Sequence, residues 1–371
     1  MRPMKTLAFW SWASLVAISA SAQGLSPSIA IGERLSMRSA VLGEERPYWV
    51  HLPESYRDDK YARRPYPVLY LLDGGSSFHF ATGTVQFMSA GTSGSIQIPE
   101  LIVVAIPNTD RTRDLTPTHA LRRRDGDDDD PSLKSSGGGD AFLNFLKDEL
   151  IPHIDRTYRT QPYRIIVGHS FGGLLALHAL QSEPDLFQGY IAIDPSVFWD
   201  DQVLVRRAMA RSKNGNGRSR TVYLSLSGSY SGGYLGDAAT KFAEHLKTAA
   251  GVRSTLQYFE SENHQSVPLI ALYYGLLFVF DGYKLSPGQM FEQASDLAAH
   301  FEPVSRRTGV ALVPPERFVD QVAHAFLGAG QIDKAIGLFT FNASRNPTSL
   351  NAYNSLGQAY AAKHRVVSPK P

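Results

Sequence analysis

Residues 165–176 read IIVGHSFGGLLA, and this stretch decides the fold that the sequence predicts. Its apolar beginning is typical of a buried strand, and its Ala- and Leu-rich end is typical of a helix. The glycines that flank Ser170 let the chain turn sharply between the two elements and leave the approach to the serine open. The sequence therefore predicts an exposed serine nucleophile at a helix N-terminus, where the helix dipole and the Phe171 amide favour an oxyanion.

Other apolar runs of the same kind precede and follow this stretch. They do not alternate with polar residues, so we expect strands that are buried on both faces, as in a parallel sheet. Helices are predicted between them, the clearest at residues 142–151, 172–181 and 238–250, and an antiparallel hairpin of residues 35–41 and 46–52 comes first. The predicted fold is therefore α/β, an α/β-hydrolase with a mostly parallel central sheet, helices on both faces and a small helical C-terminal extension. The unbroken apolar runs cover residues 68–72, 101–106 and 165–167, and further strands are predicted at residues 190–193, 221–226 and 255–259.

A serine hydroxyl is a poor nucleophile at neutral pH, so Ser170 needs a general base. His264 follows the last predicted strand in a polar loop, where this fold places its histidine. The third member of a catalytic triad is less well defined. Asp237 is the only acidic residue between residues 228 and 243, and its position suits either the triad acid or the N-cap of the next helix. Glu262 is the other candidate, and a Ser–His pair without an acid stays open.

Further site residues are expected beside the nucleophile. The third strand ends at two glycines, and the amide of Gly75 is the second candidate oxyanion donor, unless the glycines only reverse the chain. Arg111 lies in the loop after the next strand, where it either receives an acidic substrate group or pairs with Asp110 and Asp114. Trp199 follows a later strand, where it either forms the wall of an acyl pocket or packs in the core.

The two ends of the chain differ from its centre. Residues 1–22 combine a basic start, a short apolar stretch and a small-residue cleavage site after Ala22, which predicts a signal peptide and a secreted or periplasmic protein. No stable membrane span is expected, because the apolar stretch is shorter than a spanning helix. Residues 23–285 are assigned to the hydrolase domain. Residues 286–371 are assigned to the helical extension, in which an offset of 34 residues aligns several small and aromatic positions.

This spacing resembles a tetratricopeptide repeat, although two unrelated amphipathic helices would also fit. Only one repeat and the start of another are present, too few to bury a core alone. We therefore expect the extension to pack on the hydrolase domain or on a protein partner.

Charge and cysteine content exclude several functional classes. The formal net charge is +2, which gives no electrostatic reason to expect nucleic acid or an anionic membrane as a partner. The chain contains no cysteine, so disulfides, a thiol nucleophile and thiolate metal sites are excluded. A small-molecule substrate fits this composition better.

Four segments of the chain resemble the putative esterase family, which includes siderophore esterases, S-formylglutathione hydrolases, feruloyl esterases and mycolyl transferases. The resemblance spans about residues 30 to 283 and is nearest to exported bacterial members that are similar to the siderophore esterases. In order, the segments are YPVLYLLDG at 66–74, IPNTDRTRDLTP at 106–117, GHSFGG at 168–173 and ENHQSVP at 262–268.

The resemblance implies Ser170 as the nucleophile, His264 as the base, and the amides of Gly75 and Phe171 around the oxyanion. Family members often carry a glutamate near the position of Ser231, so the resemblance leaves the acid undecided. It implies hydrolysis of a small-molecule ester, such as a siderophore-type ester, through an acyl-serine intermediate without a cofactor or metal. Two alternatives stay open. The same residues also suit acyl transfer to an alcohol, and a catalytically weak hydrolase fold would suit a binding module that acts through the helical tail.

Overall fold

The computed structural model describes residues 29–60, 63–90, 95–123, 126–210, 219–230, 233–286, 288–289 and 297–367. The chain divides into two compact units, residues 1–30 and 31–371, and the second contains the sheet and its helices. The predicted signal peptide of residues 1–22 lies outside the described residues. Within the described part, no helix has both the length and the apolar character needed to cross a bilayer.

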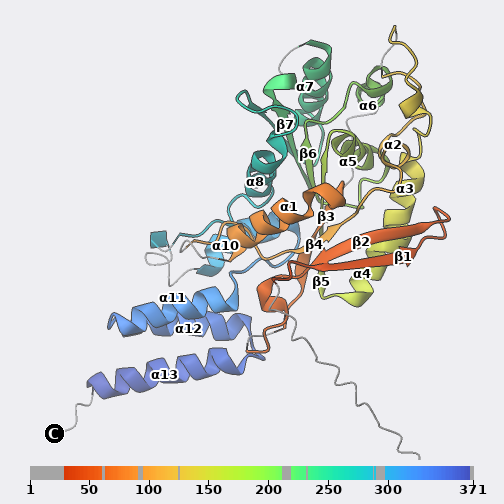
Figure 1. Cartoon of the computed structure of the whole chain (residues 1–371). Helices are drawn as coiled ribbons and strands as arrows, with labels where there is room; N and C mark the ends of the chain where they lie inside the picture. Colours follow the sequence, from red (N-terminus) through yellow and green to blue (C-terminus); the bar gives the residue numbers. More distant parts are fainter. Residues whose placement is uncertain are drawn as a thin grey trace, which may run out of the picture. The chain divides into compact units, whose positions relative to one another are not determined.

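An eight-stranded sheet forms the centre of the second unit (Figure 1). Its strands are β1 (Glu33–Arg38), β2 (Glu45–His51), β3 (Tyr66–Leu71), β4 (Ile102–Ala105), β5 (Thr160–His169), β6 (Gly189–Ile193), β7 (Arg220–Ser227) and β8 (Val252–Phe259). Their order is β1-β2-β4-β3-β5-β6-β7-β8. β2 runs antiparallel to β1 and β4, and the other neighbours pair in parallel. The predicted mostly parallel sheet of an α/β fold is therefore confirmed.

Helices cover both faces of this sheet (Figure 1). Because successive side chains of a strand point to opposite faces, Val68 and Tyr70 of β3 pack in one apolar core, while Leu69 and Leu71 pack in the other. The first core includes residues from α3, α4, α5, α6 and α7, and the second includes residues from α1 and α8. These helices are α1 (Gly74–Ser89), α3 (Gly139–Phe145), α4 (Ile151–Thr157), α5 (Phe171–Ser182), α6 (Trp199–Ala210), α7 (Gly233–Lys247) and α8 (Val267–Val279).

The C-terminal extension is helical, as predicted, and it packs on the hydrolase domain. Phe301 and Val304 belong to the same buried core as α1 and α8, and the ring of Phe301 lies 5.1 Å from that of Tyr283. The hydroxyl of Tyr283 also donates to the carbonyl of Val313 at 3.0 Å. A tetratricopeptide character and a protein partner for this extension stay predictions. Its helices are α10 (Leu297–Thr308), α11 (Glu316–Gly328), α12 (Ile332–Arg345) and α13 (Leu350–Val367).

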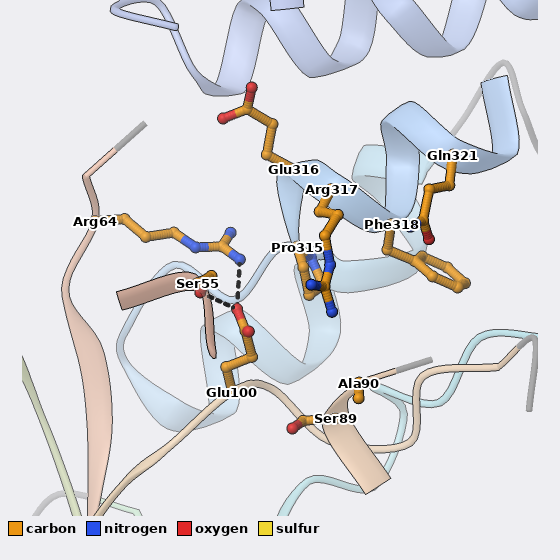
Figure 2. A pocket seen from close by; sticks show the side chains of 10 residues that line it. All are labelled: Ser55, Arg64, Ser89, Ala90, Glu100, Pro315, Glu316, Arg317, Phe318 and Gln321. Carbon is orange, nitrogen blue, oxygen red and sulfur yellow. Dashed lines mark hydrogen bonds and ion pairs between the residues drawn. The ribbon is translucent and has the colours of Figure 1, made fainter. Parts of the chain in front are cut away.

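A small polar pocket lies where the extension meets the hydrolase domain (Figure 2). In this pocket the carboxylate of Glu100 accepts from Arg64 at 3.2 Å and from Ser55 at 2.7 Å. Arg317 of α11 pairs with Glu54 at 2.9 Å and so adds a second ionic contact across the junction. The pocket encloses about 20 Å³, which is room for one water molecule and far too little for an ester substrate. We therefore treat this region as a structural junction.

A buried ionic cluster joins the hairpin to α2 (Arg111–Leu115), the short helix that follows β4. Arg46 of β2 contacts Asp114 at 2.7 Å, and only 1% of each side chain is exposed. Arg113 contacts the other carboxylate oxygen of Asp114 at 2.7 Å and also pairs with Glu44 at 2.7 Å. Hydrogen bonding from Arg113 lowers the pKa of Glu44 to about 2. The cluster thereby fixes the loop that carries Arg111 against the edge of the sheet.

We expect Arg46→Met to lower the free energy of unfolding by about 3 kcal/mol, because the buried carboxylate of Asp114 loses one of its two cations. Urea denaturation of the full chain measures this loss. Arg63→Met is the matched control, since Arg63 pairs with Asp59 while both side chains are more than two thirds exposed, at 71% and 81%. Its effect should stay below about 1 kcal/mol. Equal effects of the two substitutions would contradict the prediction.

Candidate active site

Ser170 lies in the predicted sharp turn between β5 and α5. Its backbone adopts φ 60° and ψ −117°, a conformation that side-chain-bearing residues rarely adopt. The flanking sequence permits this turn because a Cβ at Gly168 would lie 2.2 Å from the backbone of Gly172. A Cβ at Gly173 would lie 2.9 Å from Pro195. The strained serine at a strand-to-helix turn is the geometry that presents a nucleophile at the edge of such a sheet.

His264 lies in the loop after β8, as predicted, and its carboxylate partner is Asp194. Nδ1 of His264 and Oδ2 of Asp194 are 3.1 Å apart, and Asp194 is fully buried. The same carboxylate accepts from the amide and the hydroxyl of Ser227, each at 2.5 Å. Asp194 follows β6 directly, so it reaches the histidine from the strand next to the nucleophile's own strand. Three donors therefore fix the orientation of this carboxylate.

This arrangement corrects the predicted position of the acid. Asp237 was expected after β7, either in the triad or as an N-cap, but α7 begins four residues earlier, at Gly233. Asp237 thus lies inside the helix with an exposed side chain. Glu262, the other candidate, accepts from the hydroxyl of Ser266 at 2.5 Å. The signal that would have identified Asp194 is an acidic residue directly after an apolar strand that neighbours β5.

Two aromatic side chains contact the ring of His264. Tyr230, at the end of the turn after β7, stacks on it with a centroid distance of 4.9 Å and an angle of 15°. His169, next to the nucleophile, has its ring centroid 4.3 Å from that of His264. Burial, followed by the nearby His264, lowers the pKa of His169 to about 4. His169 is therefore neutral at pH 7. Its ring contact with His264 shows that His264 lies at the sheet edge that carries Ser170.

The hydroxyl of Ser170 has its own partner in this structure. Its Oγ lies 3.3 Å from Oγ of Ser196, and the amide of Ser196 donates to the carbonyl of Ser170 at 3.1 Å. Ser196 is buried two residues after Asp194. The segment after β6 therefore contacts Ser170 through Ser196 and His264 through Asp194.

The two predicted oxyanion donors lie at the N-termini of α5 and α1. Phe171 is the first residue of α5 and Gly75 is the second residue of α1, so neither amide has an acceptor within its helix. Among the described residues, no backbone carbonyl outside the two helices accepts a hydrogen bond from either amide. Asp73, just before α1, has a φ of 54°. Both amides are thus available to a negatively charged ligand atom.

Arg111 connects these two helix N-termini. Its guanidinium binds both carboxylate oxygens of Asp73, at 2.7 and 3.0 Å, and donates to the carbonyl of His169 at 3.2 Å. Asn108 also donates to Asp73 at 2.7 Å. Arg111 therefore forms its ion pair with Asp73 and not with the predicted partners Asp110 and Asp114. Its side chain keeps an exposed fraction of 36%.

Trp199 packs in the core, which is one of the two environments that the sequence allows for it. It is fully buried, donates from Nε1 to Thr118 at 3.1 Å, and packs edge-on against Phe171 at 5.2 Å. Direct contact with a substrate, which was the functional hypothesis for Trp199, is therefore excluded in this conformation. Its contact with Phe171 instead supports the first residue of α5.

Comparisons with known proteins agree with this geometry. Residues 39–267 match the model of the family described as "Putative esterase". The chain is 30% identical over 241 residues to the ferri-bacillibactin esterase BesA of Bacillus subtilis, covering 60% of this chain and 82% of that protein. It is also 30% identical over 174 residues to a siderophore triacetylfusarinine C esterase of Aspergillus fumigatus, covering 44% of this chain and 56% of that protein.

Among solved structures, an IroE-like serine hydrolase from Shewanella oneidensis superposes with a TM-score of 0.75 at 29% identity. The match covers 84% of this chain and 99% of that one. The family match spans more than half of the chain. The chain therefore belongs to the putative esterase family and is a carboxylic ester hydrolase.

Proposed function

We propose that the enzyme hydrolyses small carboxylic esters through an acyl-serine intermediate, with Ser170 as nucleophile, His264 as general base and Asp194 as the acid. The observation that carries this proposal is the hydrogen bond between His264 and the fully buried Asp194, beside the turn at Ser170. Asp194 holds Nδ1, so Nε2 of the neutral imidazole is the proton acceptor. The same contact argues against a binding module that lacks a competent acid.

The reaction begins when the Ser170 hydroxyl rotates from Ser196 to His264. Nε2 of His264 takes the hydroxyl proton as Oγ bonds to the ester carbonyl carbon, and the carbonyl oxygen becomes an oxyanion. The amides of Phe171 and Gly75 donate to that oxyanion. His264 then protonates the leaving alcohol as its bond to the carbonyl carbon breaks, which leaves an acyl-serine. A water molecule attacks this ester with the same assistance from His264, releases the acid and restores Ser170.

Substitution of the acid distinguishes Asp194 from the acid predicted from the sequence. We expect Asp194→Asn to lower kcat for p-nitrophenyl butyrate by about 10³- to 10⁴-fold, because an amide at this position favours the wrong histidine tautomer. Asp237→Asn is the matched control and should change kcat by less than about twofold, since Asp237 is exposed on α7.

Ser170→Ala and His264→Ala complete the series, with a fluorophosphonate probe as a second measurement. Ser170→Ala should abolish both turnover and labelling. A large loss in Asp237→Asn with normal activity in Asp194→Asn would overturn the assignment of the acid.

We propose a siderophore-type ester as the natural substrate and an exported enzyme. Support for the substrate class comes from two relatives, one named a ferri-bacillibactin esterase and the other a siderophore triacetylfusarinine C esterase. Support for export comes from the signal-peptide pattern of residues 1–22. We expect kcat/KM for a catecholate trilactone to exceed that for p-nitrophenyl butyrate by at least about tenfold. Liquid chromatography of the iron-free and ferric trilactone, each incubated with enzyme, measures this. A higher value for the simple ester would contradict the substrate class. A faster reaction with an added alcohol than with water would favour acyl transfer.

We propose that Arg111 positions the oxyanion donors through Asp73 and does not bind the substrate. Arg111→Met should lower kcat by about 10- to 100-fold and change KM by less than about threefold, because the Gly75 amide loses its fixed position. Arg111→Lys keeps the charge but not the paired hydrogen bonds, and should be intermediate. Steady-state kinetics with a neutral and an anionic ester test this. A rise in KM that is confined to the anionic ester would show that Arg111 binds substrate.

A further inference from the structure

Three side chains with metal-ligating atoms meet at the edge of the sheet. His169 ends β5, Asp194 follows β6, and His264 follows β8. One ligand atom from each of the three side chains lies within 4.8 Å of the others. Ligands around a tetrahedral Zn²⁺ are about 3.4 Å apart when each bond is about 2.1 Å long. Side-chain movements of about 1 Å therefore bring these atoms to bonding distance.

His169 has no part in the proposed reaction, yet one of its ring nitrogens is left without a partner. Its Nε2 is buried and has no hydrogen-bond partner among the described residues. Buried polar atoms in proteins are normally paired. His169 also belongs to the cluster of three ligating side chains, so it is a candidate metal ligand.

We propose that His169, Asp194 and His264 bind one divalent transition-metal ion, with Zn²⁺ as the probe, and that the bound ion inhibits the esterase. Two imidazoles and one carboxylate form a donor set that suits Zn²⁺, Cu²⁺ and Ni²⁺, whereas Mg²⁺ and Ca²⁺ prefer oxygen ligands. Inhibition follows because a metal-bound His264 can no longer act as the general base and a metal-bound Asp194 can no longer orient it. Metal binding itself does not depend on the proposed function; only its inhibitory effect does.

Zinc binding is measured first on the full chain after dialysis against a chelator. We expect the wild-type chain and Ser170→Ala to bind one Zn²⁺ each by isothermal titration calorimetry. His169→Gln should raise the dissociation constant at least about tenfold, because one of three ligands is lost. His364→Gln, an exposed histidine on α13, is the matched control and should leave the dissociation constant unchanged. Equal zinc affinity in His169→Gln and wild type would overturn the proposal.

Inhibition is measured with p-nitrophenyl butyrate. Zn²⁺ should inhibit wild type and His364→Gln at the same concentration, His169→Gln should need at least about tenfold more, and Mg²⁺ should have no effect. Zinc binding that depends on His169 but leaves turnover unchanged would overturn the inhibitory part alone. A wild-type chain that binds Zn²⁺ through His169 but never turns over esters would instead contradict the proposed function.

Electron paramagnetic resonance of Cu²⁺ bound to Ser170→Ala gives a test that needs no ligand variant. Splitting from two imidazole nitrogens is expected. A spectrum with one nitrogen or none would overturn the site even if His169→Gln failed to fold.

Discussion

The arrangement of the candidate active site depends on the hydrogen bond between Asp194 and His264. A buried carboxylate is costly unless it is paired and hydrogen-bonded, and here the amide and the hydroxyl of Ser227 stabilise it as well as the histidine. Because Ser227 is the last residue of β7, the carboxylate connects the ends of β6 and β7 with the loop after β8. The position of His264 is thereby fixed by the sheet.

The position of the acid after β6 is consistent with the parallel sheet. Parallel strands bring their carboxyl ends to one edge, and β6 lies between the nucleophile's strand and β7. From this position Asp194 contacts Nδ1 of His264 at 3.1 Å, whereas Asp237 is exposed on α7. The sequence has no acidic residue directly after β7. At this end of the sheet, Ser227 instead donates a hydrogen bond to the carboxylate of Asp194, and Tyr230 stacks on the imidazole ring of His264.

Much of the fold follows from local sequence, whereas the complete site does not. Unbroken apolar runs predict β3, β4 and β6 because these strands are buried on both faces, and the glycines around Ser170 predict the turn. The order of the strands is not encoded in any one segment. The pairing of Asp194 with His264 joins residues 70 positions apart, and only that order brings them together. The sequence pattern does not predict the long helices α1 and α8, because neither has a strongly amphipathic pattern.

Arg111 holds the N-termini of α1 and α5 in fixed positions relative to each other. Its guanidinium binds the carboxylate of Asp73 on one side and the carbonyl of His169 on the other. Asp73 has a backbone conformation with positive φ, which is unfavourable for a residue with a side chain unless other contacts hold it. Arg113 and Asp114 in the same short helix belong to the buried ionic cluster with Arg46, so the helix that carries Arg111 is held from its other side as well. The geometry of the proposed oxyanion site is therefore coupled to the packing of the hairpin.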